Sequence, residues 1–386
     1  MRTRASYDPG RALLACAAAA LLVAGTALAA PPTDEDCLAC HDDPKQALVK
    51  ESIHGQAGLA CTDCHADLAK VTEFPHEEKL APPACTSCHE EAGKKWQASV
   101  HGESKSGRPH AQCADCHGGH DVLPAADKGS RTNHFNVPAT CERCHANGKD
   151  AEAMRSYEDS IHAKALKQAG LVVAPNCASC HGAHDVLRVA DAGSRVHSAN
   201  VPATCGACHQ GIRQTYEQSV HWARVQEGRR AAVCSDCHSS HGIRLTNVAA
   251  WRLDVVRECG TCHEARIRTY RDGFHGKVTK LGYERVATCS DCHGNHDIRP
   301  GSDPGSKVNA ANRAATCARC HAGATASFAE YNPHADPEDP ESGLILHYTA
   351  RFMKLLLIGV FSFFGLHTAL WLTRSLRQRA ARTEGK

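Results

Sequence analysis

The sequence is short of the residues that usually build a protein core. Aromatic residues make up 5% of its 386 positions, methionine occurs three times, and no long apolar run lies between residues 30 and 351. A conventional hydrophobic core therefore needs apolar surface from another source. The formal net charge of +2 argues against a nucleic-acid-binding protein, because such proteins need a strongly basic surface.

Cysteine, by contrast, is abundant and regularly spaced. The pentapeptide Cys-x-x-Cys-His occurs eleven times and uses 22 of the 23 cysteines. These pairs are Cys37 and Cys40, Cys61 and Cys64, Cys85 and Cys88, Cys113 and Cys116, Cys141 and Cys144, Cys177 and Cys180, Cys205 and Cys208, Cys234 and Cys237, Cys259 and Cys262, Cys289 and Cys292, Cys317 and Cys320. Each copy matches the attachment signature of a c-type haem, so the sequence predicts eleven covalent haems c.

Two other uses of these cysteines fit the pattern less well. A zinc ribbon pairs its Cys-x-x-Cys knuckles into four-ligand sites and needs no histidine directly after the second cysteine. An odd number of knuckles, each followed by histidine, is not typical of such sites. A disulfide scaffold leaves the cysteine spacing free, whereas here it is invariant within every motif.

The haems would also replace the missing core. Residues 30–351 provide only about 29 residues per motif, which is enough for a loop and a short helix. We therefore expect a mostly irregular fold with short α-helices packed around haems, little or no β-sheet, and a largely unfolded apoprotein.

The two ends of the chain predict export and a membrane anchor. Residues 1–29 read as a signal peptide, with arginines before an apolar stretch that ends in small residues. Cys16 lies inside it, in a weak likeness to a lipoprotein cleavage box. Residues 344–373 contain an apolar run long enough to cross a bilayer once. Because the tail, residues 374–386, is basic, we expect it in the cytoplasm and residues 30–343 in the periplasm.

The histidines supply enough second ligands for every iron. The motifs provide His41, His65, His89, His117, His145, His181, His209, His238, His263, His293 and His321. One further histidine follows each motif, giving His54, His76, His101, His120, His162, His184, His221, His241, His275, His296 and His334. Methionine cannot fill this role, because Met154 is the only one outside the terminal segments. We therefore predict bis-histidine iron ligation and low reduction potentials.

The segments between the motifs alternate between two sequence patterns. Odd-numbered motifs precede a helical-looking stretch that ends in histidine, such as residues 157–162. Four of the five even-numbered motifs carry a close histidine three residues on, and the second motif does not. Two histidines three apart on one helix turn point the same way, so the second should bind a different haem. Pro138 and Pro202, in the repeated segment Asn-Val-Pro-Ala-Thr-Cys, are expected to break the chain before the next motif.

These motifs carry a resemblance. Over residues 37–334 the chain resembles multihaem cytochromes c with doubled Cys-x-x-Cys-His motifs, related to the cytochrome c3 and c7 types. The Cys-x-x-Cys-His-x-x-His segments that begin at Cys113, Cys177, Cys234 and Cys289 mark it best. The resemblance implies bis-histidine haems and periplasmic electron transfer.

The C-terminal segment is similar to the ends of cytochromes that work beside a membrane di-haem cytochrome b in quinol-oxidising systems. It contains Asn332-Pro333-His334, then His347, then His367 within the apolar run. His367 is a candidate for haem b ligation, quinone contact or helix packing. His347 is a candidate ligand of the last haem in place of His334, and His110, His134 and His197 are spare.

The leading hypothesis is an electron conduit. A membrane cytochrome b or another quinol-oxidising subunit would supply electrons, and periplasmic cytochromes c would accept them during anaerobic respiration. Such a protein has no catalytic site of its own. The alternative is a multihaem reductase of nitrogen or sulfur oxyanions, which needs one iron with an open position. A filament subunit is a third possibility, and the membrane anchor argues against it.

Overall fold

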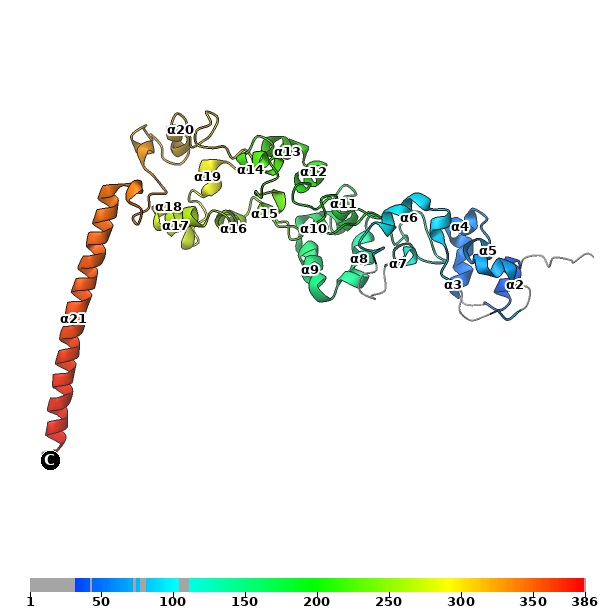
Figure 1. The fold of residues 1–386 in the computed structure, drawn as a ribbon, viewed down its shortest axis with the longest axis horizontal. Helices are drawn as coiled ribbons and strands as arrows, with labels where there is room; N and C mark the ends of the chain where they lie inside the picture. Colours follow the sequence, from blue (N-terminus) through cyan, green and yellow to red (C-terminus); the bar gives the residue numbers. More distant parts are fainter. Residues whose placement is uncertain (1–31, 42–43, 72–73, 77–80, 104–110, 385–386) are drawn as a thin grey trace, which may run out of the picture. The chain divides into compact units, whose positions relative to one another are not determined.

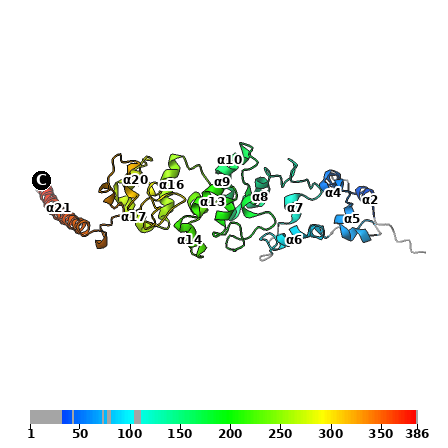
Figure 2. The same ribbon diagram turned by 90° about the horizontal axis from the view of Figure 1, so that it is seen from above.

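The computed structural model describes residues 32–41, 44–71, 74–76, 81–103 and 111–384. The predicted signal peptide, Cys16 and the spare histidine His110 lie outside these residues. Within them the chain forms short helices joined by long irregular segments, and it contains no β-strand (Figures 1 and 2). The predicted fold class is therefore confirmed.

The chain divides into two compact units. The first comprises residues 1–144 and 176–187, and the second comprises residues 145–175 and 188–386. Helices that lie in the first unit are α2 (Asp34–Leu38), α3 (Pro44–Ala47), η1 (Leu48–Glu51), α4 (Ile53–Gln56), α5 (Cys61–Cys64), η2 (Ala66–Lys70), η3 (Cys85–Ser87), α6 (Glu90–Gln97), α7 (Cys113–His117) and α11 (Cys177–His181). Helix α8 (Val137–His145) ends at the boundary.

The helices of the second unit run from η4 to the long helix α21. These are η4 (Gly148–Asp150), α9 (Ala151–Asp159), α10 (Ile161–Lys167), α12 (Val201–Gly206), α13 (Gln210–Tyr216), α14 (Val220–Gln226), α15 (Cys234–His238), α16 (Ala249–Gly260), α17 (Glu264–Asp272), α18 (Phe274–Lys280), α19 (Cys289–His293), α20 (Arg313–Ala318), η5 (Phe328–Glu330), η6 (Pro340–Ser342) and α21 (Leu344–Glu384).

Little apolar surface is buried in either unit. The largest fully buried side chains include Leu166, Pro138 and Pro202, and the others are Ser99 and Ser160. Serines would not rank among the largest buried side chains of a conventional core, where Leu, Ile and Phe dominate. The protein chain alone thus provides a thin core, as the shortage of aromatic residues predicts.

Three loops with the same hydrogen bonds connect even motifs to the odd motifs that follow. In the first, the Asn136 amide donates to the carbonyls of Lys128 and Ser130, and the Thr140 hydroxyl donates to the Arg131 carbonyl. Asn200 with Thr204, and Asn312 with Thr316, repeat the arrangement. The asparagine and threonine of the repeated Asn-Val-Pro-Ala-Thr-Cys segment therefore hold the loop closed, and Asn312-Arg-Ala-Ala-Thr-Cys317 does the same without the proline.

The prolines of this segment do not separate the loop from the motif. Pro138 lies in the first turn of α8, and Pro202 lies in the first turn of α12. Proline is tolerated there because the first turn has no intrahelical partner for its missing N–H. The expected break before the motif was wrong, because each helix begins one residue before its proline and continues into the motif's first cysteine.

Helix α21 differs from all the others. It runs for 41 residues from Leu344 and leaves the rest of its unit as one straight rod (Figure 1). By length and apolar composition it can cross a membrane, and none of its apolar stretch is buried against the protein. It begins where the membrane segment was predicted to begin, and it continues as helix through the basic residues 374–384.

Candidate haem-binding sites

Four even-numbered motifs each form a five-residue helix that ends at the motif histidine. These helices are α7, α11, α15 and α19. In α7 the Asp115 carboxylate accepts a hydrogen bond from the Gln112 backbone N–H, and Asp236 and Asp291 do the same in α15 and α19. A carboxylate in the first turn of a helix stabilises it, so these cysteine motifs fold locally.

The close histidine does not share the motif's helix turn. Gly118 follows His117 with a φ of 92°, Gly182 and Gly294 have φ values of 86° and 89°, and Ser239 has a φ of 61°. These left-handed residues end the helix and turn the chain before the close histidine. The expectation of two histidines on one helix turn was therefore wrong, because it assumed a continuous helix.

The first, fifth, seventh and ninth motifs place their following histidine in the first turn of a second helix, whereas His101 and His334 lie in turns. A helix such as α9 ends at Asp159, Ser160 adopts an extended conformation, and His162 then lies in α10. The Ser160 hydroxyl accepts a hydrogen bond from the Ala163 N–H, and Ser52 and Ser219 cap α4 and α14 in the same way. The predicted single stretch ending in histidine is thus two helices separated by a capping residue.

The structure brings the predicted ligands together in pairs. In nine pairs, each within one unit, a motif histidine faces a non-motif histidine with 5.8–6.3 Å between the ring centroids. The pairs are His41–His76, His89–His54, His65–His120, His117–His184, His209–His162, His263–His221, His238–His296, His321–His275 and His293–His334.

This separation fits one iron between the two rings. A metal–imidazole nitrogen bond is about 2.0–2.1 Å and a ring centroid lies about 1.1 Å behind its nitrogen, so two imidazoles on one metal have centroids about 6.3 Å apart. Direct stacking of two rings would allow a closer approach. The spacing therefore leaves room for a metal ion between the members of each pair.

Except for the first motif, whose His41 faces His76 after the second motif, odd and even motifs take their partners from opposite directions along the chain. His89 of the third motif faces His54, which follows the first motif, and the seventh, ninth and eleventh motifs also reach two motifs back. His117 of the fourth motif faces His184, which follows the sixth, and the second and eighth motifs also reach two motifs ahead. No motif in these pairs uses its own close histidine.

The facing imidazoles favour the neutral form that binds metals. Burial lowers the pKa of His117 first, and the charge of His184 lowers it further. The pKa of His162 falls through burial and His209, and that of His293 falls through burial and His334. In the second motif, the His65 Nδ1 atom is buried without a hydrogen-bond partner among the described residues. Neutral imidazoles with available lone pairs are what an iron site requires.

Thiols of successive motifs also meet. The first cysteine of an odd motif lies against the first cysteine of the next even motif, as shown by the effect of one on the pKa of the other. A hydrogen bond with Cys177 is the largest cause that raises the pKa of Cys141. The other pairs are Cys37–Cys61, Cys85–Cys113, Cys205–Cys234 and Cys259–Cys289. These thiols would not titrate once bonded to porphyrin. Their pKa shifts indicate only that the two thiols of each pair lie close together.

A second set of neighbouring thiols relates four even motifs to the odd motif that follows in the same unit. Burial is the main cause that raises the pKa of Cys116, and Cys141 and Cys144 add to it. Cys64 with Cys85, Cys237 with Cys259, and Cys292 with Cys317 show the same relation. Motifs one to six in the first unit, and seven to eleven in the second, therefore lie in sequence order with their thiols adjacent.

One motif histidine carries a carboxylate partner that the sequence reasoning missed. His145 Nδ1 lies 3.0 Å from Asp150 Oδ2. In the third, seventh and ninth motifs a helix begins directly after the histidine, whereas η4 intervenes here and supplies Asp150. The unusually long 36-residue spacing after Cys141 was the available signal. A carboxylate on the outer nitrogen makes an imidazole a more basic ligand.

The eighth motif has a different second neighbour. Trp251 of α16 lies parallel to His238, with 4.8 Å between centroids and 7° between planes. Helix α16 replaces the asparagine-clamped loop found after the fourth, sixth and tenth motifs. Arg252 fixes α16 through hydrogen bonds to the Glu284 carbonyl and the Asp291 carboxylate.

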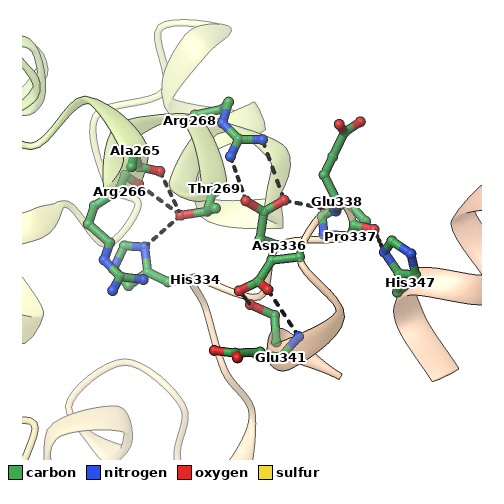
Figure 3. A network of polar contacts seen from close by, with 12 residues as sticks. Ala265, Arg266, Arg268, Thr269, His334, Asp336, Pro337, Glu338, Glu341 and His347 are labelled. Carbon is green, nitrogen blue, oxygen red and sulfur yellow. Dashed lines mark hydrogen bonds and ion pairs between the residues drawn. The ribbon is translucent and has the colours of Figure 1, made fainter. Parts of the chain in front are cut away.

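The remaining histidines separate into two groups. His101, His145, His181 and His241 stay predicted ligands. His347 is not needed in place of His334, because the eleventh motif's His321 faces His275 and His334 faces His293 of the tenth motif. His347 is buried and its Nδ1 lies 2.9 Å from the Pro337 carbonyl (Figure 3). Of the spare histidines, His134 contacts the Asn176 amide and His197 accepts a hydrogen bond from the Ala199 N–H.

Comparison with known proteins agrees with this geometry. Residues 53–146 match the family model described as cytochrome c3. The chain is 28% identical over 197 residues to a curated protein named multiheme cytochrome MtrA, from Shewanella baltica (strain OS185). That alignment covers 47% of this chain and 51% of the relative, so the chain spans about half the length of the curated relative it matches.

The chain is a multihaem c-type cytochrome. The paired cysteines of this cytochrome are the attachment points of covalent haem c. The facing histidines within each unit show how the chain of the cytochrome can hold several haem irons at once.

Proposed function

We propose that this cytochrome is a membrane-anchored periplasmic conduit that carries electrons from a quinol-oxidising membrane cytochrome b to periplasmic cytochromes c or extracellular acceptors in anaerobic respiration. The observation that carries the proposal is the set of nine histidine pairs with an iron-sized space between their rings. A bound haem would supply one-electron redox chemistry at each site.

We assign the 22 motif cysteines to covalent attachment of eleven haems, and the histidines to axial ligation. The nine pairs each fill both axial positions of one iron, and we extend histidine ligation to His101, His145, His181 and His241. Two imidazole ligands without methionine favour low potentials, which suit electrons that come from a quinol or pass to weak oxidants. Filled axial positions also leave an iron no place for substrate.

The order of the motifs supports conduction. In each unit, thiols of successive motifs adjoin, so the porphyrin edges that these thiols bond would also lie close together. In seven of the nine pairs the distal histidine joins its own segment to a motif two positions away, and in the other two it joins neighbouring motifs. The chain thereby crosslinks the row repeatedly and holds neighbouring sites at fixed distances.

The membrane side of the proposal rests on α21. Its apolar stretch lies between Arg351 and Lys354 at one end and the basic residues 374–384 at the other, so the positive-inside rule favours a cytoplasmic tail. His367 lies within this stretch, and an ionisable side chain in a membrane helix favours a partner contact. We propose that His367 meets the cytochrome b partner, at a haem b or at its quinone.

The reductase alternative is weakened by the same pairs. An oxyanion reductase needs an iron with an open position, whereas nine motif histidines face a second imidazole. No motif replaces its histidine by lysine. No observation in the described residues favours a substrate site instead.

An anchor exchange tests the conduit directly. Residues 344–384 are replaced by an unrelated single-span helix, and His367→Leu is made in the native helix. We expect normal haem content in both variants, loss of quinol-dependent haem reduction in membranes with the exchanged helix, and a strong decrease with His367→Leu. Wild-type rates in the exchanged variant would show that α21 does not serve a quinol-oxidising partner.

A further inference from the structure

Four segments that carry distal histidines make one repeated contact. The residue before the histidine donates its backbone N–H to a carbonyl two residues after a close histidine, with N···O distances of 2.8–2.9 Å. The four contacts are Ile53 to Val122, Val100 to Val186, Ile161 to Ile243, and Val220 to Ile298. Each joins the segment after an odd motif to the segment after an even motif three places further along. The residue before the distal histidine is therefore covered wherever the segment after a later even motif lies against it.

The ninth motif's helix, α18, departs from the repeat. Phe274 lies at the equivalent position, and its backbone N–H donates a hydrogen bond to no carbonyl among the described residues. Its side chain is 75% exposed, whereas Ile53, the most exposed of the other four, is 42% exposed. Leu281 and Tyr283, just after the helix, are 86% and 55% exposed. An apolar surface therefore lies open at the C-terminal end of the array.

Basic side chains surround this apolar surface. Phe274, Lys277 and Leu281 are spaced i, i+3 and i+7, so they share one helix face. Arg271, Lys280 and Arg285 are also exposed nearby in the sequence, against one exposed acid at Asp272. A helix with exposed aromatic and aliphatic residues beside lysine and arginine is typical of a surface that lies on a membrane. We call Phe274, Lys277, Lys280, Leu281 and Tyr283 the α18 surface.

A polar network fastens this part of the unit to the start of the membrane helix (Figure 3). Thr269 Oγ1 of α17 lies 3.1 Å from His334 Nδ1, and Arg268 forms a two-point ion pair with Asp336. Glu338, two residues on, pairs with Lys354 of α21.

The same short segment also contacts an earlier turn of α21 through the Pro337 carbonyl and His347. Helix α17 is thus linked to the first turns of α21 through residues 334–338, and α18 packs against α17 (Figure 1). In a helix that crosses a bilayer, the turns around Arg351 and Lys354 lie at the level of the lipid headgroups.

We propose that the α18 surface lies on anionic lipid headgroups, with Phe274, Leu281 and Tyr283 in the interface and the two lysines against phosphate. The inference rests on the membrane anchor of the proposed function. The exposed apolar and basic side chains of the α18 surface suit an interface of this kind, because anionic headgroups attract basic side chains within a Debye length. Because His275 belongs to α18 and faces His321, this contact would set the height of the eleventh motif's site above the bilayer.

The test is hydrogen exchange of the full-length cytochrome in nanodiscs. Discs of phosphatidylcholine alone are compared with discs that also contain phosphatidylglycerol, and peptides covering residues 271–285 are followed. We expect slower exchange in the anionic discs, and at least about tenfold less protection in Lys277→Gln/Lys280→Gln. Phe274→Ser/Leu281→Ser should lose protection in both kinds of disc.

A matched control exists in α10, where Lys164 and Lys167 occupy the positions of Lys277 and Lys280. Lys164→Gln/Lys167→Gln should leave exchange at residues 271–285 unchanged. Equal exchange in the two kinds of disc, or an equal loss in the α10 control, would overturn the proposal. Protection that needs native membranes and is absent from anionic discs would also overturn it, and would place a protein there. Failure of the chain to enter discs would instead contradict the anchor itself.

Discussion

Odd and even motifs hold the same kind of site by different means. Four even motifs fold as their own short helices, three of them with an acid in the first turn, and the close histidine follows a left-handed residue such as Gly118. The first, fifth and seventh motifs rely on two further helices, and their following histidine comes after a capping serine such as Ser160. The even ligand is therefore positioned by a tight turn, and these odd ligands by helix packing. Apart from the first motif, the two classes take their partners from opposite directions along the chain, so that the motifs within each unit are crosslinked.

Removing a distal ligand should give the largest effect and tests the direction of reach. His184→Ala should convert one haem from low spin to high spin and raise its potential by about 100 mV or more, because an imidazole ligand is lost. EPR and potentiometry of the purified protein measure both changes.

The affected haem identifies the partner. If His184 serves the fourth motif, Cys113→Ala/Cys116→Ala/His184→Ala should show no new high-spin signal, since that haem is no longer attached. A persistent high-spin signal would mean that His184 serves another motif, and the proposed reach of even motifs would be wrong.

The even-motif turn should be sensitive to one methyl group. Gly118→Ala adds a Cβ at a φ of 92°, and that atom would lie 2.4 Å from Asp121 Oδ1. We expect a loss of about 1–2 kcal/mol in stability, seen as a lower midpoint of thermal unfolding monitored through the haem absorbance. Gly119→Ala is the control, because its Cβ meets nothing within 4 Å. Equal effects at both positions would contradict the role given to the turn.

Asp150 should distinguish the fifth motif from the other odd motifs. Asp150→Asn replaces the anionic hydrogen-bond acceptor of His145 with a neutral amide. The imidazole becomes a less basic ligand, which should raise the potential of one haem by about 50 mV. Spectroelectrochemical titration measures the shift. Glu152→Gln removes the same charge two residues away without touching His145, and it should shift no potential as far. A larger shift in Glu152→Gln would mean that net charge, and not the hydrogen bond, tunes this site.

The smallest expected effect concerns the odd-motif cap. Ser160→Ala removes the acceptor for the Ala163 N–H from a fully buried position and should cost about 1 kcal/mol. Gly273→Ala at the equivalent position of α18 removes no cap, since glycine has no side chain to lose. Thermal melts of the two variants compare them. Similar destabilisation by both would argue that the serine acts through packing alone.

The sequence predicted the composition of the sites better than their connections. Cysteine spacing and the histidine count predicted the fold class and the histidines that face one another, because both are local properties of the chain. The two-motif reach could not be read from the sequence, since it depends on how segments far apart pack. The helix break at Ser160 was missed because the sequence of residues 157–162 predicts one helical stretch, although a serine before a helix is a known cap. Asp150 was missed because its contact follows from a local insertion.

The central claim is that the motif histidines share irons with the histidines that face them. Low-temperature EPR of the oxidised, detergent-purified full-length cytochrome, with a pyridine haemochrome count of the haems, tests it most directly. We predict eleven haems c and low-spin signals without a stoichiometric high-spin component. A stoichiometric high-spin signal would reveal an iron with an open position, and would contradict the account of this cytochrome as a conduit without a substrate site.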